Sequence, residues 1–223
     1  MRFTEFTPFD LVLLAQGLGV TIGLFLLTSL IGVIVGTAWG VIRFYRVPVL
    51  MQLVTFVAEL LKNSPVLVQL FLVFFGFPAF FHLNLGPVQA AVLTLSANTA
   101  AFVYVIAVSA IESIGRDQIE SARVFGLTRW QVLRHVIAPQ AAAFSIGPLT
   151  ALLVNQLQVT SLISVIGVMD LAKIGATLNL RTLKPFVVWS VVGLLYYVTA
   201  KLVAAAGTRI ETRLRAHSAF RGL

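Results

Sequence analysis

The sequence predicts an all-α membrane protein with about five transmembrane helices and one helical hairpin outside the bilayer. Of its 223 residues, 59% are hydrophobic and 11% are charged. Soluble domains carry about 25% charged residues, so a soluble fold would have nowhere to hide this much apolar surface. At about 20 residues per span, the chain has room for about five spans. The longest polar interruption, Glu120–Pro139, predicts the hairpin. Residues 1–223 are expected to form a single transmembrane domain.

The first span is expected from about Leu11 to Ile42. It is longer than the hydrocarbon thickness requires, so the helix is expected to tilt or to protrude. Small residues at helical spacing let helix backbones approach closely in lipid. The spacing therefore predicts packing against a neighbouring helix along Gly19, Gly23, Gly32, Gly36 and Gly40.

The next stretch, residues 49–77, is expected to be two apolar segments joined by a polar linker that ends at Pro65. Glu59 and Lys62 are three residues apart, so on a helix they share a face and can pair. Two interpretations stay open for them. They line a cavity at membrane depth, or they mark a helix end at which Lys62 reaches the interface. Residues 76–87 are expected to form an uncharged turn region.

Polar residues mark the third and fourth spans. The third, about Val88–Ile111, contains polar residues that must bond across helices or line a wet cavity. The fourth, about Ala141–Val159, ends in amides that a lipid-facing helix would not tolerate, so that face is expected to look inward. The candidate solute-pathway residues are Asn98, Thr99, Asn155, Gln158, Thr160 and Ser161.

The distribution of basic residues predicts the orientation in the membrane. Gly167–Pro185 is expected to be a surface segment with a short amphipathic helix over Met169–Ala176, and the last span is expected at about Phe186–Ala206. Five spans place the two ends on opposite sides. One side then collects most of the cations: Arg43, Arg46, Arg116, Arg123, Arg129, Arg134, Arg209, Arg213, Arg215 and Arg221. The other side has Arg2, Lys173, Arg181 and Lys184, partly offset by Glu5, Asp10 and Asp170. The positive-inside rule therefore places the C-terminus and the hairpin in the cytoplasm and the N-terminus outside.

The hairpin itself, within residues 112–139, carries local folding signals. Gly126 divides it into two short helical pieces. Thr128 is expected to cap the second piece, with Gln131 reaching back as in a capping box. Pro139 is expected in the first turn of the following helix, where its missing N–H costs nothing. An ordered, basic hairpin between membrane spans is typical of a docking element.

The sequence lacks the motifs of a self-powered enzyme or pump. It has no GxxxxGK[ST], HExxH or GxSxG motif, and its three histidines are scattered. Few ionisable groups lie at membrane depth, whereas a proton-driven pump normally has several in relay. The chain is therefore expected not to be an enzyme and to bind no cofactor or metal, with energy supplied by a partner. The net charge of +8 fits cytoplasmic membrane edges, so no nucleic-acid partner is expected.

Several motifs resemble those of a known family. The hairpin resembles the EAA loop of ABC importer permeases through Glu120-Ser121-Ala122, Gly126, Ile137 and Pro139, with serine in place of the usual second alanine. The chain also resembles the polar amino acid subfamily of these permeases at further motifs. These motifs follow the subfamily's order and cover nearly the whole chain. These are Asn63-Ser64-Pro65 with Gln69, Phe75-Gly76 with Pro78, Leu95 to Asn98, Pro139-Gln140-Ala141 and Thr160-Ser161-Leu162.

This resemblance implies a permease subunit of a bacterial ABC importer for an amino acid or a similar polar solute. It implies a multi-pass protein of the cell inner membrane, a second permease subunit and an extracytoplasmic solute-binding protein. It also implies cytoplasmic ATPase subunits, which would hold the ATP and Mg²⁺. The EAA loop would couple the chain to the ATPase through Glu120, Ser121, Ala122, Arg123, Gly126, Leu127 and Thr128. Small Ser121 and Ala122 are expected to let the partner surface come close.

The chain departs from the subfamily where charged residues usually contact the solute. Val105, Val108 and Gln158-Val159 stand at positions where the subfamily often has a glutamate, an arginine and a Lys-Asp pair. Either a homologous second subunit carries the charges, or the solute is less charged; of these, a homologous heterodimer is favoured over a homodimer.

A membrane scaffold without a transport role is disfavoured by the amides at Asn98, Asn155, Gln156 and Gln158, which are too many for lipid-facing helices. The other alternative function is a stand-alone secondary carrier or channel. Such a protein would need inverted repeats with broken helices, and the halves show no convincing repeat.

Overall fold

The computed structural model describes residues 5–220, with side chains through Leu214, and this part of the chain is helical without a strand. Arg2, Arg221 and the side chain of Arg215, which contributed to the predicted orientation, lie outside the described residues. The α-helices are α1 (Pro8–Tyr45), α2 (Pro48–Lys62), α3 (Val66–Phe71), α4 (Phe77–Phe81), α5 (Pro87–Glu112), α6 (Arg116–Val124), α7 (Arg129–Val132), α8 (Ala138–Val159), α9 (Leu171–Thr182) and α10 (Pro185–Phe220). Three further turns are π turns η1 (Leu72–Gly76) and η2 (Leu133–Ile137) and the 3-10 helix η3 (Thr160–Ile166).

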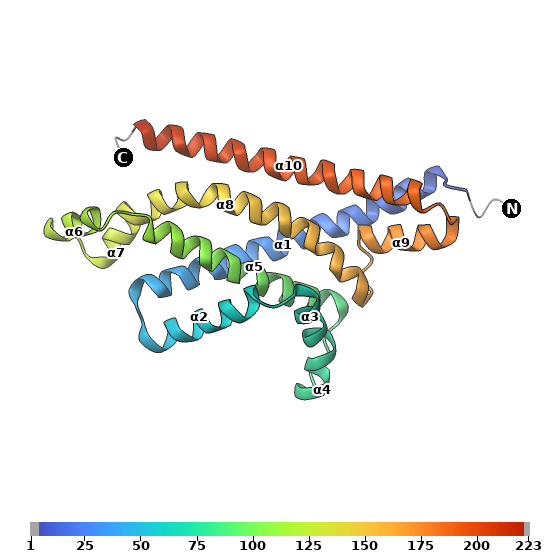
Figure 1. The fold of residues 1–223 in the computed structure, drawn as a ribbon, viewed down its shortest axis with the longest axis horizontal. Coiled ribbons are helices and arrows are strands. Elements are labelled where there is room, and N and C mark those ends of the chain that lie inside the picture. The colour runs from blue at the N-terminus through green and yellow to red at the C-terminus, as the bar shows by residue number, and fades with distance from the viewer. Residues whose placement is uncertain (1–4, 221–223) are drawn as a thin grey trace.

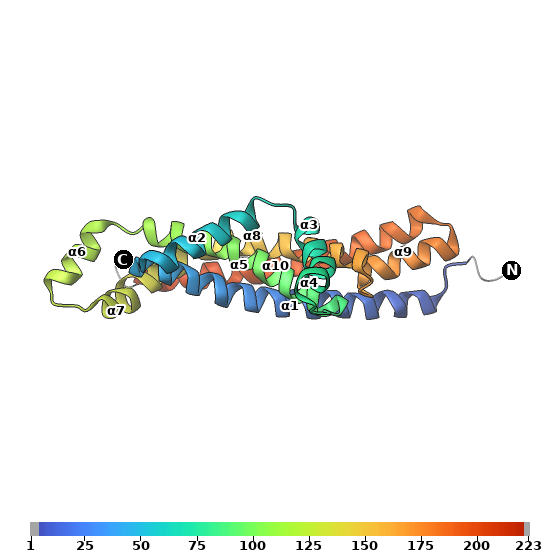
Figure 2. The same ribbon diagram turned by 90° about the horizontal axis from the view of Figure 1, so that it is seen from below.

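The long helices form an elongated bundle. In the described range, four helical stretches are long and apolar enough to cross a membrane: Pro8–Tyr45, Pro87–Glu112, Arg129–Ile166 and Pro185–Leu214. A fifth candidate is the pair 48–62 and 66–81, which is bent by 108° at its break. The expectation of about five spans is confirmed, with one of them broken. Hairpin α6–α7 and the C-terminal end of α10 lie at one end of the bundle, and the N-terminal end of α1 lies at the other (Figure 1, Figure 2).

Glycines of α1 bring it close to α5. A Cβ on Gly36 would lie 2.5 Å from the carbonyl oxygen of Ala100, and one on Gly32 would lie 2.5 Å from the Cβ of Thr99. Gly40 packs in the same way against α5. Gly19 and Gly23 have nothing within 4 Å, so the predicted stripe packs within this chain only over its second half.

Helix α9 corrects the expected surface segment. The amphipathic helix was expected over Met169–Ala176, but it begins at Leu171 and continues to Thr182. Its face at spacings of three and four, Leu171, Ile174 and Leu178, is buried against α1 and α10. Burial of this stripe is what holds the helix beyond residue 176, because an amphipathic face gains stability only by packing.

Pro78 and Pro139 each lie inside continuous helix directly after a π turn, which corrects the expected turn at residues 76–81. Pro78 follows π turn η1 and Pro139 follows π turn η2. A proline lacks the N–H of a helical bond, and its ring clashes with the carbonyl four residues earlier. The wider π turn lets the helix pass each proline. Helix therefore continues to Phe81, and the fourth span is continuous with the second arm of the hairpin from Arg129 to Ile166.

Candidate functional site

The hairpin at the end of the bundle folds by its own local signals. Gly126 has a φ of +81°, a conformation that glycine adopts without strain, and it makes the bend between α6 and α7. The Thr128 N–H donates to Oε1 of Gln131 at 2.8 Å, and the Gln131 N–H donates to Oγ1 of Thr128 at 3.3 Å. The capping box is therefore present as expected, and it fixes the start of α7.

The inner face of the hairpin is anchored to the bundle. Ala122 is buried in a cluster with Val132, Leu133 and Ile137, and Leu127 packs at its edge. The Nε2 of Gln140 in α8 donates to Oε1 of Gln118 in α6 at 2.9 Å. The small side chain of Ala122 thus serves packing within the hairpin, whereas Ser121 lies on the opposite, exposed face. These contacts join α6 to α8.

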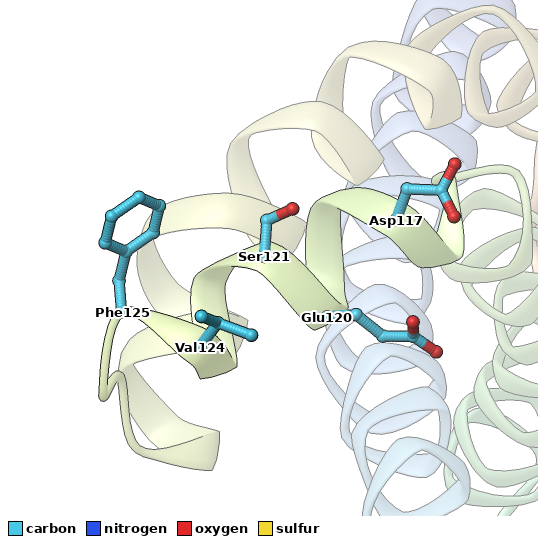
Figure 3. Close-up of a pocket in the computed structure, with 5 residues that line it drawn as sticks. All are labelled: Asp117, Glu120, Ser121, Val124 and Phe125. Carbon is cyan, nitrogen blue, oxygen red and sulfur yellow. The ribbon is translucent and has the colours of Figure 1, made fainter.

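The outer face of α6 presents carboxylates beside bare apolar side chains. Asp117, Glu120, Ser121, Val124 and Phe125 line a shallow groove of about 290 Å³ (Figure 3). The side chains of Val124 and Phe125 are 86% and 84% exposed. Val124 and Phe125 are neighbours in the sequence and form an exposed apolar patch at the tip of a polar hairpin. Sequence reasoning did not include Asp117, Val124 or Phe125. The apolar pair directly before Gly126 was the signal that could have found them.

The structure separates the candidate pathway residues into two groups. Asn98, Thr99 and Thr160 are buried between helices. Asn155 and Gln158 are exposed, and the hydroxyl of half-buried Ser161 donates to the Gln158 carbonyl at 2.7 Å. Asn155, Gln158 and Ser161 are spaced three residues apart at the end of α8 and the start of η3. They form what we call the polar stripe. Thr99 packs against Gly32, and the hydroxyl of Thr160 donates to the Leu157 carbonyl at 2.6 Å.

Gln156 faces away from this stripe. It is buried, and its Nε2 donates to Oγ1 of Thr28 at 3.3 Å and to the Leu95 carbonyl at 3.5 Å. The sequence suggested that the amides at the end of α8 share one inward face, but in the structure they do not. Gln156 joins α8 to α1 and α5, whereas Asn155 and Gln158 are available for contacts outside the described chain.

The expected position of a solute-binding charge is apolar here. Val105 lines a cavity of about 310 Å³ between α5 and α8, together with Phe144 and Pro148. The residues that line this cavity include two serines and no charged side chain. Elsewhere in the described residues, Glu59 and Lys62 form the expected pair at 3.4 Å, with Glu59 exposed.

An ion pair between a buried carboxylate and an exposed arginine joins α1 to α9 at the end of the bundle opposite the hairpin. The Nη2 of Arg181 donates to Oδ2 of Asp10 at 2.5 Å, and Asp10 is fully buried. The Thr7 N–H donates to the same oxygen at 2.8 Å. Sequence reasoning counted these two residues only as outer charges. No sequence signal links residues this far apart.

Asp170 caps α9 in the same region. Its Oδ1 accepts from the Lys173 N–H at 2.8 Å, while its Oδ2 is buried without a hydrogen-bond partner. Burial raises the pKa of Asp170 from 3.8 to about 6. Because the ionised form is disfavoured in the fold, this group contributes stability that is present below about pH 4 and lost as pH rises through 6.

Replacing Asp170 with asparagine should therefore raise stability at pH 7.5. Asparagine is as good an N-cap as aspartate and has no charge to bury. Two pKa units correspond to about 2–3 kcal/mol of free energy of unfolding. Thermal unfolding of both proteins at pH 4.5 and pH 7.5 checks this. The melting temperature of the variant should exceed that of the wild type by more at pH 7.5 than at pH 4.5. An equal difference at both pH values would contradict the prediction.

The described residues contain no group of three or more His, Asp or Glu side chains that could hold a metal ion. What the geometry does offer is mechanical. An exposed face of α6 at one end of the bundle is connected, through helix α8, to a polar stripe near the other end of that helix.

Residues 13–216 match the model of the family described as binding-protein-dependent transport system inner membrane component. The chain is 28% identical over 204 residues to the glutamine transport system permease protein GlnP of Escherichia coli K12, covering 91% of this chain and 93% of that protein. It is 31% identical over 214 residues to the L-cystine transport system permease protein TcyB of Bacillus subtilis, covering 93% and 91%.

Solved structures show the same fold. A chain from the crystal structure of an amino acid ABC transporter with histidines superposes with a TM-score of 0.84 at 26% identity, covering 94% of this chain and 99% of that one. A chain of the MetNI methionine ABC transporter, at 21% identity, superposes with a TM-score of 0.82 and shares the fold. The chain belongs to the family of binding-protein-dependent transport system inner membrane components.

Proposed function

We propose that this chain is the permease subunit of an ATP-driven ABC importer for an amino acid or a similar polar solute. The relatives at 28% and 31% identity are named for glutamine and L-cystine transport, which supports this solute class. The N-terminus lies outside and the C-terminus and hairpin α6–α7 lie in the cytoplasm, because the cations gather at that end. A binding protein delivers the solute from outside.

The observation that carries the proposal is the exposed face of α6 on an anchored hairpin. Glu120, Ser121 and Arg123 are exposed there, next to Val124 and Phe125. We expect this face to sit in a groove of a cytoplasmic ATPase, with the apolar pair buried by the partner. Gly126, Leu127 and Thr128 set the bend, and Ala122 holds α6 to the bundle. ATP and Mg²⁺ belong to the ATPase.

Asn155, Gln158 and Ser161 line the solute route in this proposal, because they are the candidates whose stripe remains open in the single chain. Asn98, Thr99 and Thr160 act behind it as packing residues. The cavity at Val105 has no charge to hold a zwitterion. A homologous second permease subunit that supplies such charges is therefore favoured over a second identical copy.

Reconstitution into liposomes tests the proposed function. Complexes purified from native membranes through this chain should contain an ATPase and a second, homologous permease subunit. In liposomes loaded with ATP, they should take up an amino acid only when the binding protein is present outside. The same preparation without the ATPase should show no flux. Solute flux through this chain alone would instead establish a secondary carrier or channel.

A further inference from the structure

The break between α2 and α3 leaves backbone carbonyls without helical partners. Pro65 has no N–H, so the carbonyl of Leu61, four residues earlier, loses its donor. The carbonyl of Ser64 also lacks a helical donor, because the Val68 N–H donates to the Pro65 carbonyl at 3.0 Å instead. A carbonyl buried away from water without a partner is destabilising. Leu61 and Ser64 are partly buried, so side-chain donors that reach their carbonyls stabilise the break.

Two amides that are 29 residues apart in the sequence supply these donors. The Nε2 of Gln69 lies 2.6 Å from the Leu61 carbonyl and 3.0 Å from the Ser64 carbonyl. The Nδ2 of Asn98 lies 3.4 Å from the Leu61 carbonyl and 3.3 Å from Oε1 of Gln69. Gln69 and Asn98 are only 6% and 5% exposed. We call these two residues the amide pair.

The amide pair secures a sharp elbow in the chain. Helices 48–62 and 66–81 meet at 108°, so α3 and α4 run crosswise to the bundle (Figure 1). The residue after Gln69, Leu70, is fully buried in a cluster with Leu95, Ile163 and Ile166. Ile163 and Ile166 belong to η3, which carries Ser161. The elbow is thus packed directly against the segment that presents part of the polar stripe.

We propose that Gln69 and Asn98 are positioning residues for solute transport. They hold α3 at the elbow angle, and α3 in turn holds η3, and with it Ser161, through the buried cluster that Leu70 shares with Ile163. Neither amide contacts the solute. This inference rests on the proposed function, and it assigns a common role to two motifs, around Asn63–Gln69 and Leu95–Asn98, that the coupling surface does not use.

The first test is Gln69→Leu in the complete importer, with its ATPase and binding protein, in liposomes. Solute moved per ATP hydrolysed is expected to fall about fivefold to tenfold, which corresponds to about 1–1.4 kcal/mol, the order of one lost hydrogen bond. ATP hydrolysis should continue, because hairpin α6–α7 is untouched. Gln52→Leu, at an exposed position of α2, is the matched control and should leave the ratio unchanged.

A double variant separates positioning from simple stability. Pro65→Ala supplies an N–H that reaches the Leu61 carbonyl only if α2 continues as a helix through residue 65, so Pro65→Ala with Gln69→Leu restores that hydrogen bond at the expense of the elbow and of the Leu70 packing. Its solute-to-ATP ratio should stay low, because a continuous helix loses the elbow. The double variant also provides the test if Gln69→Leu alone does not assemble.

Two results would overturn the inference. The first is a wild-type ratio in Gln69→Leu. The second is recovery of the ratio together with stability in the double variant, which would make the amide pair a structural patch only. Absence of ATP-dependent uptake by the wild-type importer would instead refute the proposed function, and the transport role of the amide pair with it.

Discussion

Replacing Gly126 with valine is expected to lower ATP-driven solute uptake strongly while the chain still inserts into the membrane. Gly126 has a φ of +81° at the bend of the hairpin, where a β-branched side chain is strained by about 1–3 kcal/mol. Nothing lies within 4 Å of the added Cβ, so the strain comes from the backbone and not from a clash. The bend would relax, and the exposed face of α6 would no longer match a partner groove. Uptake in liposomes should fall at least about tenfold, a factor that 1.4 kcal/mol produces.

Gly115→Val is the matched control, because it changes the same residue type at the other end of α6. Gly115 has a φ of −55° and open space around it, so valine fits there without backbone strain. The control should dock the ATPase and transport nearly as well as wild type. Co-purification of the ATPase with each variant separates docking from later steps. Wild-type uptake by Gly126→Val would refute the coupling role of the hairpin.

Alanine at Gly36 is expected to destabilise the protein, although alanine normally favours a helix over glycine. The added Cβ would lie 2.5 Å from the carbonyl oxygen of Ala100 and 2.6 Å from the Cβ of Val103. Because one of these atoms is backbone, α1 and α5 must separate, at a cost of about 1–3 kcal/mol. In a chain of this size that corresponds to a fall in melting temperature of roughly 2–4 °C for each kcal/mol.

Gly23→Ala is the control on the same helix. Nothing lies within 4 Å of its Cβ, so the substitution should be neutral or stabilising by up to about 1 kcal/mol. Thermal unfolding of the two variants in the same detergent should therefore move in opposite directions from wild type, or at least differ clearly. A lower melting temperature for Gly23→Ala than for Gly36→Ala would show that the glycine stripe packs against something other than α5.

The local features of the hairpin could be predicted from the sequence because each depends on residues a few positions apart. The capping box of Thr128 and Gln131 needs only the spacing of three, and Gly126 marks the bend by its residue type. Helix α9 was predicted too short because its last turns depend on contacts with distant residues and not on local signals. Residues 177–182 hold no strong local signal, and they stay helical because Leu178 and Thr182 are buried against other helices.

The amides also show that distant contacts cannot be predicted from the sequence. Polar side chains in a membrane helix must find partners, and the sequence indicated that requirement correctly at Asn98 and at the end of α8. It did not indicate the partners. Gln156 bonds to Thr28, which is 128 residues away, and Asn98 bonds to Gln69, whereas Asn155 and Gln158 remain exposed. Which amide turns inward depends on the rotation of α8 against its neighbours.

The sequence by itself determined that this protein is a helical membrane bundle with an ordered hairpin at one end. Apolar content, span length and capping signals act locally and leave few alternatives. Only the tertiary structure decided the elbow of α2 and α3, the amide pair at the break and the ion pair of Asp10 with Arg181, which are 171 residues apart. Hydrogen bonds and ion pairs have no preferred separation along the chain, so helix packing alone selects which of the possible partners meet.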